Sequence, residues 1–219
     1  MQSNELPPVI LDIETRGDKR LENLFMDNIK APGNIKDPDK IAMAIRKKEQ
    51  EATKEMAVDT DFNEIICIGI KVVDEEPQLM NLREFVDWYN TEVKVSETDI
   101  GRRTNGMRTM VTFNGKCFDL PTMIKGAIKE GLEDFPYQDF ILMMDKYKSK
   151  GRYIDLMDDI GMVWGKNKSL DKYLQIYLGV AKKDIDFETA GVDEIKEHCL
   201  EDLLNSEKLF KKFKKLWYI

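Results

Sequence analysis

The chain has few of the residues that build disulfide frameworks and histidine-based metal sites. Its 219 residues include three cysteines, Cys67, Cys117 and Cys199, and none forms a CxxC pair. The sequence therefore indicates neither a zinc knuckle nor a disulfide scaffold. His198 is the single histidine, so a metal bound within one chain must be held mainly by carboxylate oxygens. No apolar run approaches the ~20 residues that span a bilayer, and we expect no membrane partner.

The amino-terminal residues and the charge balance exclude further classes of protein. Residues 1–8 show no basic region followed by an apolar one, so we expect no secretory signal and a cytoplasmic, intracellular protein with reduced thiols. With 41 acidic against 34 basic residues the net charge is -7, whereas a protein that coats nucleic acid nonspecifically is usually basic. A local basic strip, or cations bound by the acids, still permits contact with nucleic acid.

The hydrophobic pattern predicts an α/β fold. The hydrophobic fraction of 42% suffices for a packed core, and the length favours a single domain over residues 1–219 with a helical insertion at about 18–61. Apolar, β-branched runs predict buried strands at 8–14, 65–73 and 109–113 and an edge strand at 152–157. Helical spacing predicts helices at 38–56, 82–89, 120–131, 169–178 and 192–216. Strands interleaved with helices are typical of α/β proteins.

Two acids end the first predicted strand. Asp12 and Glu14 are two residues apart, so their side chains point to the same face of a sheet. Two neighbouring carboxylates are costly to bury unpaired, and a divalent cation such as Mg²⁺ would neutralise both. Taken alone, the pair is equally compatible with exposed acids or with pairing to Lys or Arg.

A third acid follows the strand at 109–113. Asn114-Gly115 turns the chain, and Asp119 lies near the start of the next predicted helix. An acid at that position suits the positive end of the helix dipole. By itself, Asp119 could be an ordinary helix N-terminal aspartate.

The last predicted helix carries a histidine and a fourth acid. His198 and Asp202 are four residues apart and share one face, which flanks the apolar stripe of that helix. The histidine could act as a general base toward a water while Asp202 binds a metal. The plainer alternative is a structural His–Asp pair on the helix surface.

The order of these groups resembles the DEDD superfamily of 3′–5′ exonucleases, also called DnaQ-like. The matching motifs are Asp-Ile-Glu-Thr at 12–15, Asn-x-x-x-Phe-Asp at 114–119 and His-x-x-x-Asp at 198–202. The second motif has the form found in the proofreading domains of family B DNA polymerases. Segments at 153–157, 169–174 and 178–180 also look like the predicted exonuclease relatives of that family. The resemblance extends over about residues 8–212, with 18–61 and 91–106 unplaced.

One position departs from the superfamily pattern. Its histidine branch places the histidine five residues before the last aspartate, and its tyrosine branch places a tyrosine four residues before it. Here the spacing is four and the residue is His198. Because imidazole accepts a proton near neutral pH and a phenol does not, our hypothesis is that His198 activates or orients the attacking water.

The resemblance implies an RNase H-like fold, with a mixed five-stranded sheet flanked by helices, and a two-metal mechanism. Asp12, Glu14, Asp119 and Asp202 would bind two Mg²⁺ or Mn²⁺ ions, with His198 beside them. The reaction would hydrolyse phosphodiester bonds from a single-stranded or frayed DNA 3′ end and release nucleoside 5′-monophosphates. The partner would be that DNA end and, in replication or proofreading, a DNA polymerase or another replication protein. The size and the unplaced segments suit a phage or virus replication system.

Further residues are candidates for substrate contact. Thr15 follows the first acids, and Asn114 and Phe118 belong to the motif that contains Asp119. Phe118 could stack on the terminal nucleotide or lie in the core. Lys148 and Arg152 belong to a loop in which aromatic and basic residues alternate, a pattern that favours nucleic acid.

Three alternatives remain open from the sequence. A 3′–5′ exoribonuclease of the same superfamily would carry the same motifs, because the choice of sugar depends on contacts to the 2′-OH. A non-catalytic nucleic-acid clamp or scaffold on this fold would have lost one or more acids, and all four are present. A structure-specific nuclease would not need the motif at 114–119.

Overall fold

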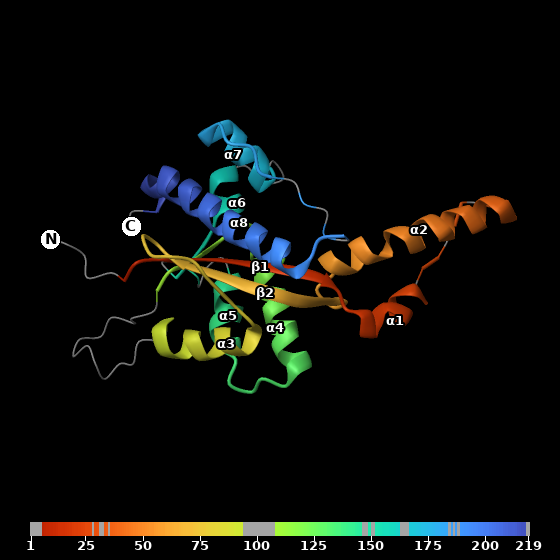
Figure 1. Cartoon of the computed structure of the whole chain (residues 1–219), viewed down its shortest axis with the longest axis horizontal. Coiled ribbons are helices and arrows are strands. Elements are labelled where there is room, and N and C mark those ends of the chain that lie inside the picture. The colour runs from red at the N-terminus through yellow and green to blue at the C-terminus, as the bar shows by residue number, and fades with distance from the viewer. Residues whose placement is uncertain are drawn as a thin grey trace.

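The computed structural model describes residues 6–27, 29–30, 33–34, 36–93, 108–145, 149, 152–162, 167–183, 185, 187 and 189–217. A five-stranded sheet in the order β3-β2-β1-β4-β5 lies at its centre (Figure 1). The strands are β1 (Val9–Gly17), β2 (Asn63–Val72), β3 (Gln78–Met80), β4 (Met110–Thr112) and β5 (Tyr153–Asp155). The β1–β2 and β2–β3 pairs are antiparallel, and the β1–β4 and β4–β5 pairs are parallel. The predicted mixed five-stranded α/β sheet is confirmed.

Helices cover both faces of this sheet (Figure 1). One layer contains α3 (Leu82–Trp88), α4 (Asp119–Glu130) and α5 (Tyr137–Met144). The other contains α6 (Leu156–Gly161), α7 (Leu170–Leu178) and α8 (Val192–Phe213). Short helical turns occupy Lys19–Leu21, Tyr89–Val93 and Lys214–Leu216. In the part of the chain that the structure describes, no helix is long and apolar enough to cross a membrane.

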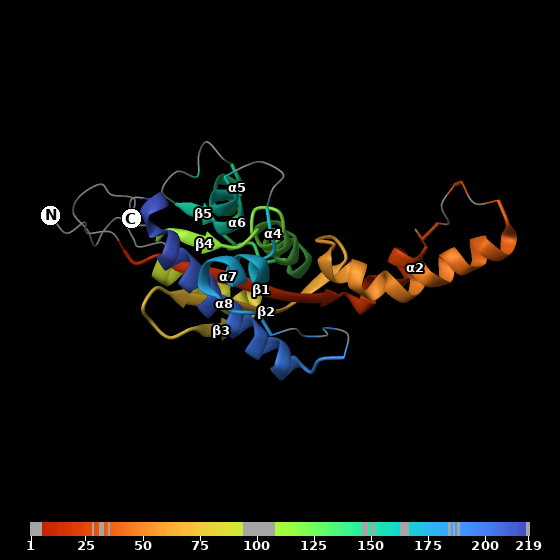
Figure 2. The ribbon, with the colours of Figure 1, turned by 90° about the horizontal axis from the view of Figure 1, so that it is seen from above.

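The segment between β1 and β2 is an extension from the body of the protein. It contains α1 (Glu22–Met26) and α2 (Pro38–Val58), and α2 projects well beyond the sheet (Figure 2). Asp37 caps α2 by accepting from the backbone N–H groups of Asp39 and Lys40, which fixes where this helix begins. Only the carboxyl-terminal part of α2, with Ala52 and Met56, is buried.

The predicted edge strand at 152–157 is shorter than expected. β5 ends at Asp155, and Leu156 and Met157 belong to α6. The side chain of Asp155 accepts from the backbone N–H groups of Met157 (3.1 Å) and Asp158 (3.5 Å). Asp155 is therefore the N-cap of α6, and this helix begins directly after β5. The sequence analysis also did not predict β3 or α5.

The central strand β1 is buried on both faces, and its alternation separates two environments. Leu11 and Ile13 belong to the core under α3, α4 and α5, whereas Ile10 packs with the cluster formed by α6, α7 and α8. Because side chains alternate along a strand, Asp12 and Glu14 lie on the face of Ile10, toward α8. The strand therefore presents both acids to α8 while its other face contributes to the core.

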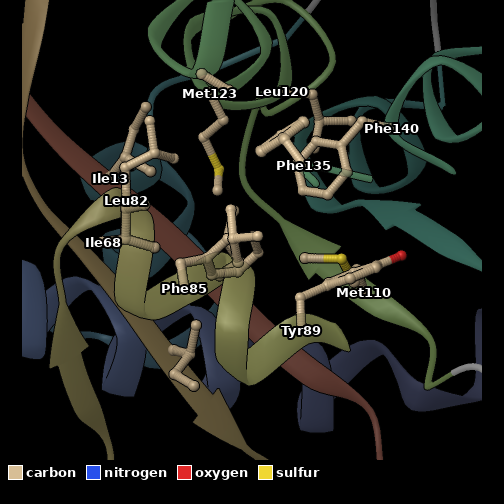
Figure 3. Close-up of a cluster of buried hydrophobic side chains, with 14 of the residues drawn as sticks. Ile13, Ile68, Leu82, Phe85, Tyr89, Met110, Leu120, Met123, Phe135 and Phe140 are labelled. Carbon is tan, nitrogen blue, oxygen red and sulfur yellow. The ribbon is translucent and has the colours of Figure 1, made fainter. Parts of the chain in front are cut away.

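The core on the opposite face fixes β1 and β2 relative to the helices. Met123 from α4, Phe85 from α3 and Phe140 from α5 belong to one buried cluster with Ile13 and Ile68 (Figure 3). The rings of Phe85 and Phe140 meet edge to face with centroids 6.0 Å apart. This packing fills the face of β1 that carries Leu11 and Ile13, and Asp12 and Glu14 lie on the opposite face, toward α8.

A glycine allows α8 to approach the sheet closely. Gly69 on β2 is paired with Asp12 on β1, and a Cβ atom added at Gly69 would lie 2.7 Å from both Cys199 Sγ and Leu203 Cδ1. Both of these side chains are fully buried. The absence of a side chain at Gly69 thus allows α8 to pack closely against the sheet, beside the strand that carries the two acids.

We expect Gly69→Ala to lower the free energy of unfolding by about 1–3 kcal/mol, the usual range for overpacking a close-packed interior. Urea denaturation measures this change. Gly33→Ala is the matched control, because no atom lies within 4 Å of a Cβ added at Gly33. Equal unfolding free energies for the two variants would contradict a tight contact at Gly69.

Candidate metal centre

The structure brings the predicted acids and the histidine together from three elements. Asp12 and Glu14 come from β1, Asp119 from the first residue of α4, and His198 and Asp202 from α8. Ligand atoms of Glu14, His198 and Asp202 all lie within 4.8 Å of one another. Asp12 and Glu14 are equally close to each other, and the charge of Asp119 acts on both.

The position of Asp119 depends on the end of β4. β4 pairs with β1 only at Val9 and Ile10, and farther along β1 the N–H of Ile13 donates to the carboxylate of Asp119. This hydrogen bond fixes the Asp119 side chain against the strand that carries Asp12 and Glu14. The hydrogen bond also satisfies a backbone donor on β1.

The turn that leads to Asp119 is strained and tightly braced. Asn114 has a φ of 66°, and a Cβ at Gly115 would lie 2.2 Å from Thr112 Oγ1, so only glycine fits there. The carboxylate of Asp155 accepts from the backbone N–H groups of Asn114 (2.9 Å) and Lys116 (3.1 Å). One side chain from β5 therefore supports both this turn and the start of α6.

One turn of α8 places His198 above Asp202. His198 Nε2 lies 3.9 Å from Asp202 Oδ2, and both side chains are buried. The ring of Phe187 contacts the imidazole edge to face, with centroids 5.3 Å apart. The ammonium of Lys182 forms an ion pair with Asp202 Oδ2. Asp202 Oδ1 is buried and has no hydrogen-bond partner among the described residues.

Burial raises the pKa of every acid in the cluster, and the charges of the other cluster acids raise the pKa of Asp12 and Glu14 further. Burial is the largest cause in each case. It raises the pKa of Glu14 to about 8 and that of Asp119 to about 7, and it raises the pKa of Asp12 and of Asp202 above the usual range. The positive charge of Lys182 opposes this by lowering the pKa of Asp12, Glu14 and Asp202. The site is short of positive charge.

A divalent cation fits this set of groups. Carboxylate oxygens are the ligands that Mg²⁺ and Mn²⁺ prefer, and a dication would offset both the cost of burying four carboxylates and the repulsion at Asp12 and Glu14. The unpartnered Oδ1 of Asp202 supplies a free ligand atom at the cluster. The acids thus form a possible metal-binding cluster whose charge and donor atoms suit a hard dication.

The residues predicted to contact substrate are placed differently from the acids. The Thr15 hydroxyl donates to the carbonyl of Ala57 at 2.7 Å, so it ties β1 to the end of α2, and its contact with substrate stays a prediction. Phe118 is half-buried and packs against the core. Asn114 is half-buried in the turn before Asp119, and its contact with substrate stays a prediction.

Two basic candidates lie elsewhere. Arg152 immediately precedes β5, and its carbonyl accepts from the N–H of Met110 at the amino-terminal end of β4. Asp119 follows the opposite end of β4, and the charge of Arg152 instead acts on Tyr89. The contact of Arg152 with substrate stays a prediction. Lys148 lies outside the described residues.

Sequence reasoning missed Lys182 and the bracing role of Asp155. Lys182 is on the irregular connection between α7 and α8, where no hydrophobic periodicity marks a position. Its backbone N–H donates to Asp171 of α7 at 2.9 Å, which anchors this part of the connection. Asp155 stands inside the segment at 153–157 already noted, and an acid between a short strand and a helix was the available signal.

We expect the stability of the metal-free protein to fall between about pH 5 and about pH 8. The folded chain retains protons on acids such as Glu14 and Asp119, with pKa values of about 8 and about 7, that the unfolded chain has already released. Stability is thus greatest at low pH and is lost as pH rises through the folded pKa values. Thermal unfolding in EDTA measures this.

Two controls identify the cause of this dependence of stability on pH. Glu14→Gln removes one titrating proton and should flatten the dependence of the melting temperature on pH. Mg²⁺ should raise the melting temperature more at high pH than at low pH, because it binds the deprotonated acids. A melting temperature in EDTA that rises or stays constant over the range would contradict the raised pKa values.

Comparisons with known proteins place the chain in a family. A sequence model of predicted 3′–5′ exonucleases related to the exonuclease domain of PolB matches residues 58–217. The matched part includes Asp119, His198 and Asp202, whereas Asp12 and Glu14 precede it. No curated protein matches the chain. With its mixed sheet flanked by helices, the chain has an α/β RNase H-like exonuclease fold and belongs to the family of predicted 3′–5′ exonucleases related to the exonuclease domain of PolB.

Proposed function

We propose that the protein is a metal-dependent 3′–5′ exonuclease that acts on the 3′ end of single-stranded or frayed DNA. The convergence of Asp12, Glu14, Asp119 and Asp202 in one buried cluster carries the proposal, because an isolated fold-level likeness would not require it. The family assignment independently supports a nuclease acting on nucleic acid.

The four acids are the proposed ligands of two Mg²⁺ or Mn²⁺ ions. Such ions lower the pKa of an attacking water and stabilise the charge that develops on the leaving 3′-oxygen. The chain supplies the fixed positions of the ligands: β1 sets Asp12 and Glu14, the braced turn sets Asp119, and α8 sets Asp202. The phosphodiester bond to the terminal nucleotide breaks, and a nucleoside 5′-monophosphate leaves.

His198 is the proposed acceptor of the proton from the attacking water. It lies beside Asp202 and Glu14 within a buried site, where its ring is held by the edge contact with Phe187. A general base in that position lies next to the proposed metal ligands and does not itself need to bind a metal. The proton then passes from the imidazole to solvent.

Digestion of a 5′-labelled single-stranded DNA oligonucleotide tests the proposal. With Mg²⁺ or Mn²⁺ we expect a ladder that shortens from the 3′ end, and none with EDTA. Asp12→Asn/Glu14→Gln should reduce the rate by about 10³-fold or more, since metal ligation contributes several kcal/mol to the transition state. This variant should remain folded, because both acids are easily protonated in the metal-free state.

Digestion of an RNA oligonucleotide of the same sequence shows whether the enzyme prefers DNA or RNA. Faster hydrolysis of RNA would make RNA the substrate and would leave the proposed 3′–5′ exonuclease reaction unchanged. Binding of either strand without hydrolysis under any metal would contradict the enzyme and favour a nucleic-acid clamp.

We expect His198→Ala to lower kcat by about 10²-fold, the lower range for loss of a general base. The rate of the native enzyme should rise with pH as the imidazole loses its proton, and this limb of the pH profile should disappear in the variant. Phe187→Leu, which keeps an apolar contact next to the ring, is the control for packing. An unchanged turnover number in His198→Ala would remove the histidine from the mechanism.

A further inference from the structure

Two buried cysteines lie on the inner side of the acid cluster and have no part in the proposed reaction. Cys67 is on β2, directly paired with Glu14 of β1. Cys199 is on α8, between His198 and Asp202. Both are free thiols that are almost completely inaccessible to solvent, and they share a hydrogen bond with each other.

The sulfur of Cys199 is close enough to the acids to share a cation with them. Cys199 Sγ and carboxylate oxygens of Asp12 and Glu14 all lie within 4.8 Å of one another. Zinc–sulfur and zinc–oxygen bonds of about 2.3 Å and about 2.0–2.2 Å allow ligands of one ion to be roughly 4 Å apart. Only small side-chain adjustments therefore separate this group from a coordination set.

The same close approach that positions α8 also positions this sulfur. A Cβ at Gly69 would lie 2.7 Å from Cys199 Sγ, so the glycine opens the space that the thiol occupies beside the acids. Cys67 is joined to Cys199 by a hydrogen bond and is not part of the group formed by Cys199, Asp12 and Glu14. Asp202, with its buried and unpartnered Oδ1, borders the other side of the cluster.

The ligand set on this side differs in kind from one of carboxylates alone. Mg²⁺ takes oxygen ligands in octahedral geometry and has little affinity for sulfur, whereas thiolates select softer ions such as Zn²⁺ and Cd²⁺. Asp12, Glu14 and Cys199 supply three of the four ligands of a tetrahedral zinc site, and a water supplies the fourth. With Mg²⁺ the Cys199 thiol stays protonated and does not bind the ion.

We propose that Asp12, Glu14 and Cys199 form a second, thiolate-containing binding mode for a soft divalent cation, Zn²⁺ or its analogue Cd²⁺. Binding deprotonates the Cys199 thiol, whose proton passes to solvent, and forms a metal–sulfur bond with no change in oxidation state. Because this mode shares Asp12 and Glu14 with the proposed catalytic ions, the soft cation is an inhibitor. The inhibitory consequence rests on the proposed function, but the binding does not.

Cadmium binding provides a direct spectroscopic readout. The experiment uses reduced, metal-free protein with Cys117→Ser, because Cys117 is exposed and would bind Cd²⁺ on its own. We expect a saturable ultraviolet sulfur-to-cadmium charge-transfer band at one equivalent, which Zn²⁺ displaces. Adding Cys199→Ser should abolish the band or weaken the affinity by about 10–100-fold, the usual effect of losing a metal-site group.

Two results would overturn the inference. One is the absence of a charge-transfer band, and the other is a band that Cys199→Ser leaves unchanged. Cys199→Ala and the thermal stability of both variants separate loss of the ligand from loss of the fold, since a folded variant without the band supports direct ligation.

Zinc inhibition of DNA hydrolysis distinguishes this inference from the proposed function. In Mg²⁺, Cys199→Ser should retain activity while its inhibition by Zn²⁺ weakens by at least about 10-fold. A Cys199-dependent cadmium band in a protein that does not hydrolyse DNA would uphold the cation site and overturn the nuclease. Hydrolysis with no cadmium band and with equal zinc inhibition in both proteins would uphold the nuclease and overturn the cation site.

Discussion

Mutual repulsion among four carboxylates in one partly enclosed place is the constraint on which the arrangement of this protein depends. Isolated buried charges are strongly unfavourable, so the metal-free chain must retain protons on its acids or provide a cation. It does both: the pKa values of all four acids are raised, and Lys182 pairs with Asp202. The surrounding elements fix the acids despite the repulsion, which is the usual price of a functional site.

The rigidity of α8 explains how the acids stay together. The middle of α8 packs against Gly69 through Cys199 and Leu203, and its carboxyl-terminal half is tied to the turn after β2 by an ion network. There Lys71 pairs with Glu207, which also accepts from the backbone N–H of Asp74 at 3.0 Å, and Lys211 bridges both acids. These contacts lie on both sides of Asp202 along the helix and oppose its movement away from Glu14.

The site residues that lie on regular strands and helices could be predicted from the sequence, and those that lie on irregular backbone could not. The two-residue period of β1 predicts that Asp12 and Glu14 share a face. The turn at Asn114 predicts that Asp119, which follows it, lies at the start of a helix. Lys182 lies on a connection without a period, so its position follows only from tertiary packing. The hydrogen bond from the Thr15 hydroxyl to the carbonyl of Ala57 could not be predicted either, because the sequence pattern does not reveal how α2 packs against β1.

Any cation that neutralises Asp202 must compete with the chain's own ammonium group. Lys182 contacts Asp202 Oδ2 while its backbone is fixed to Asp171 on α7, so the connection before α8 is joined to the acids at one end and to α7 at the other. A divalent ion bound at Asp202 would take over the charge that Lys182 now neutralises and would leave the anchor at Asp171 in place. In the proposed reaction, the freed ammonium would lie close to the cluster, where it would pair with a phosphate of the bound strand.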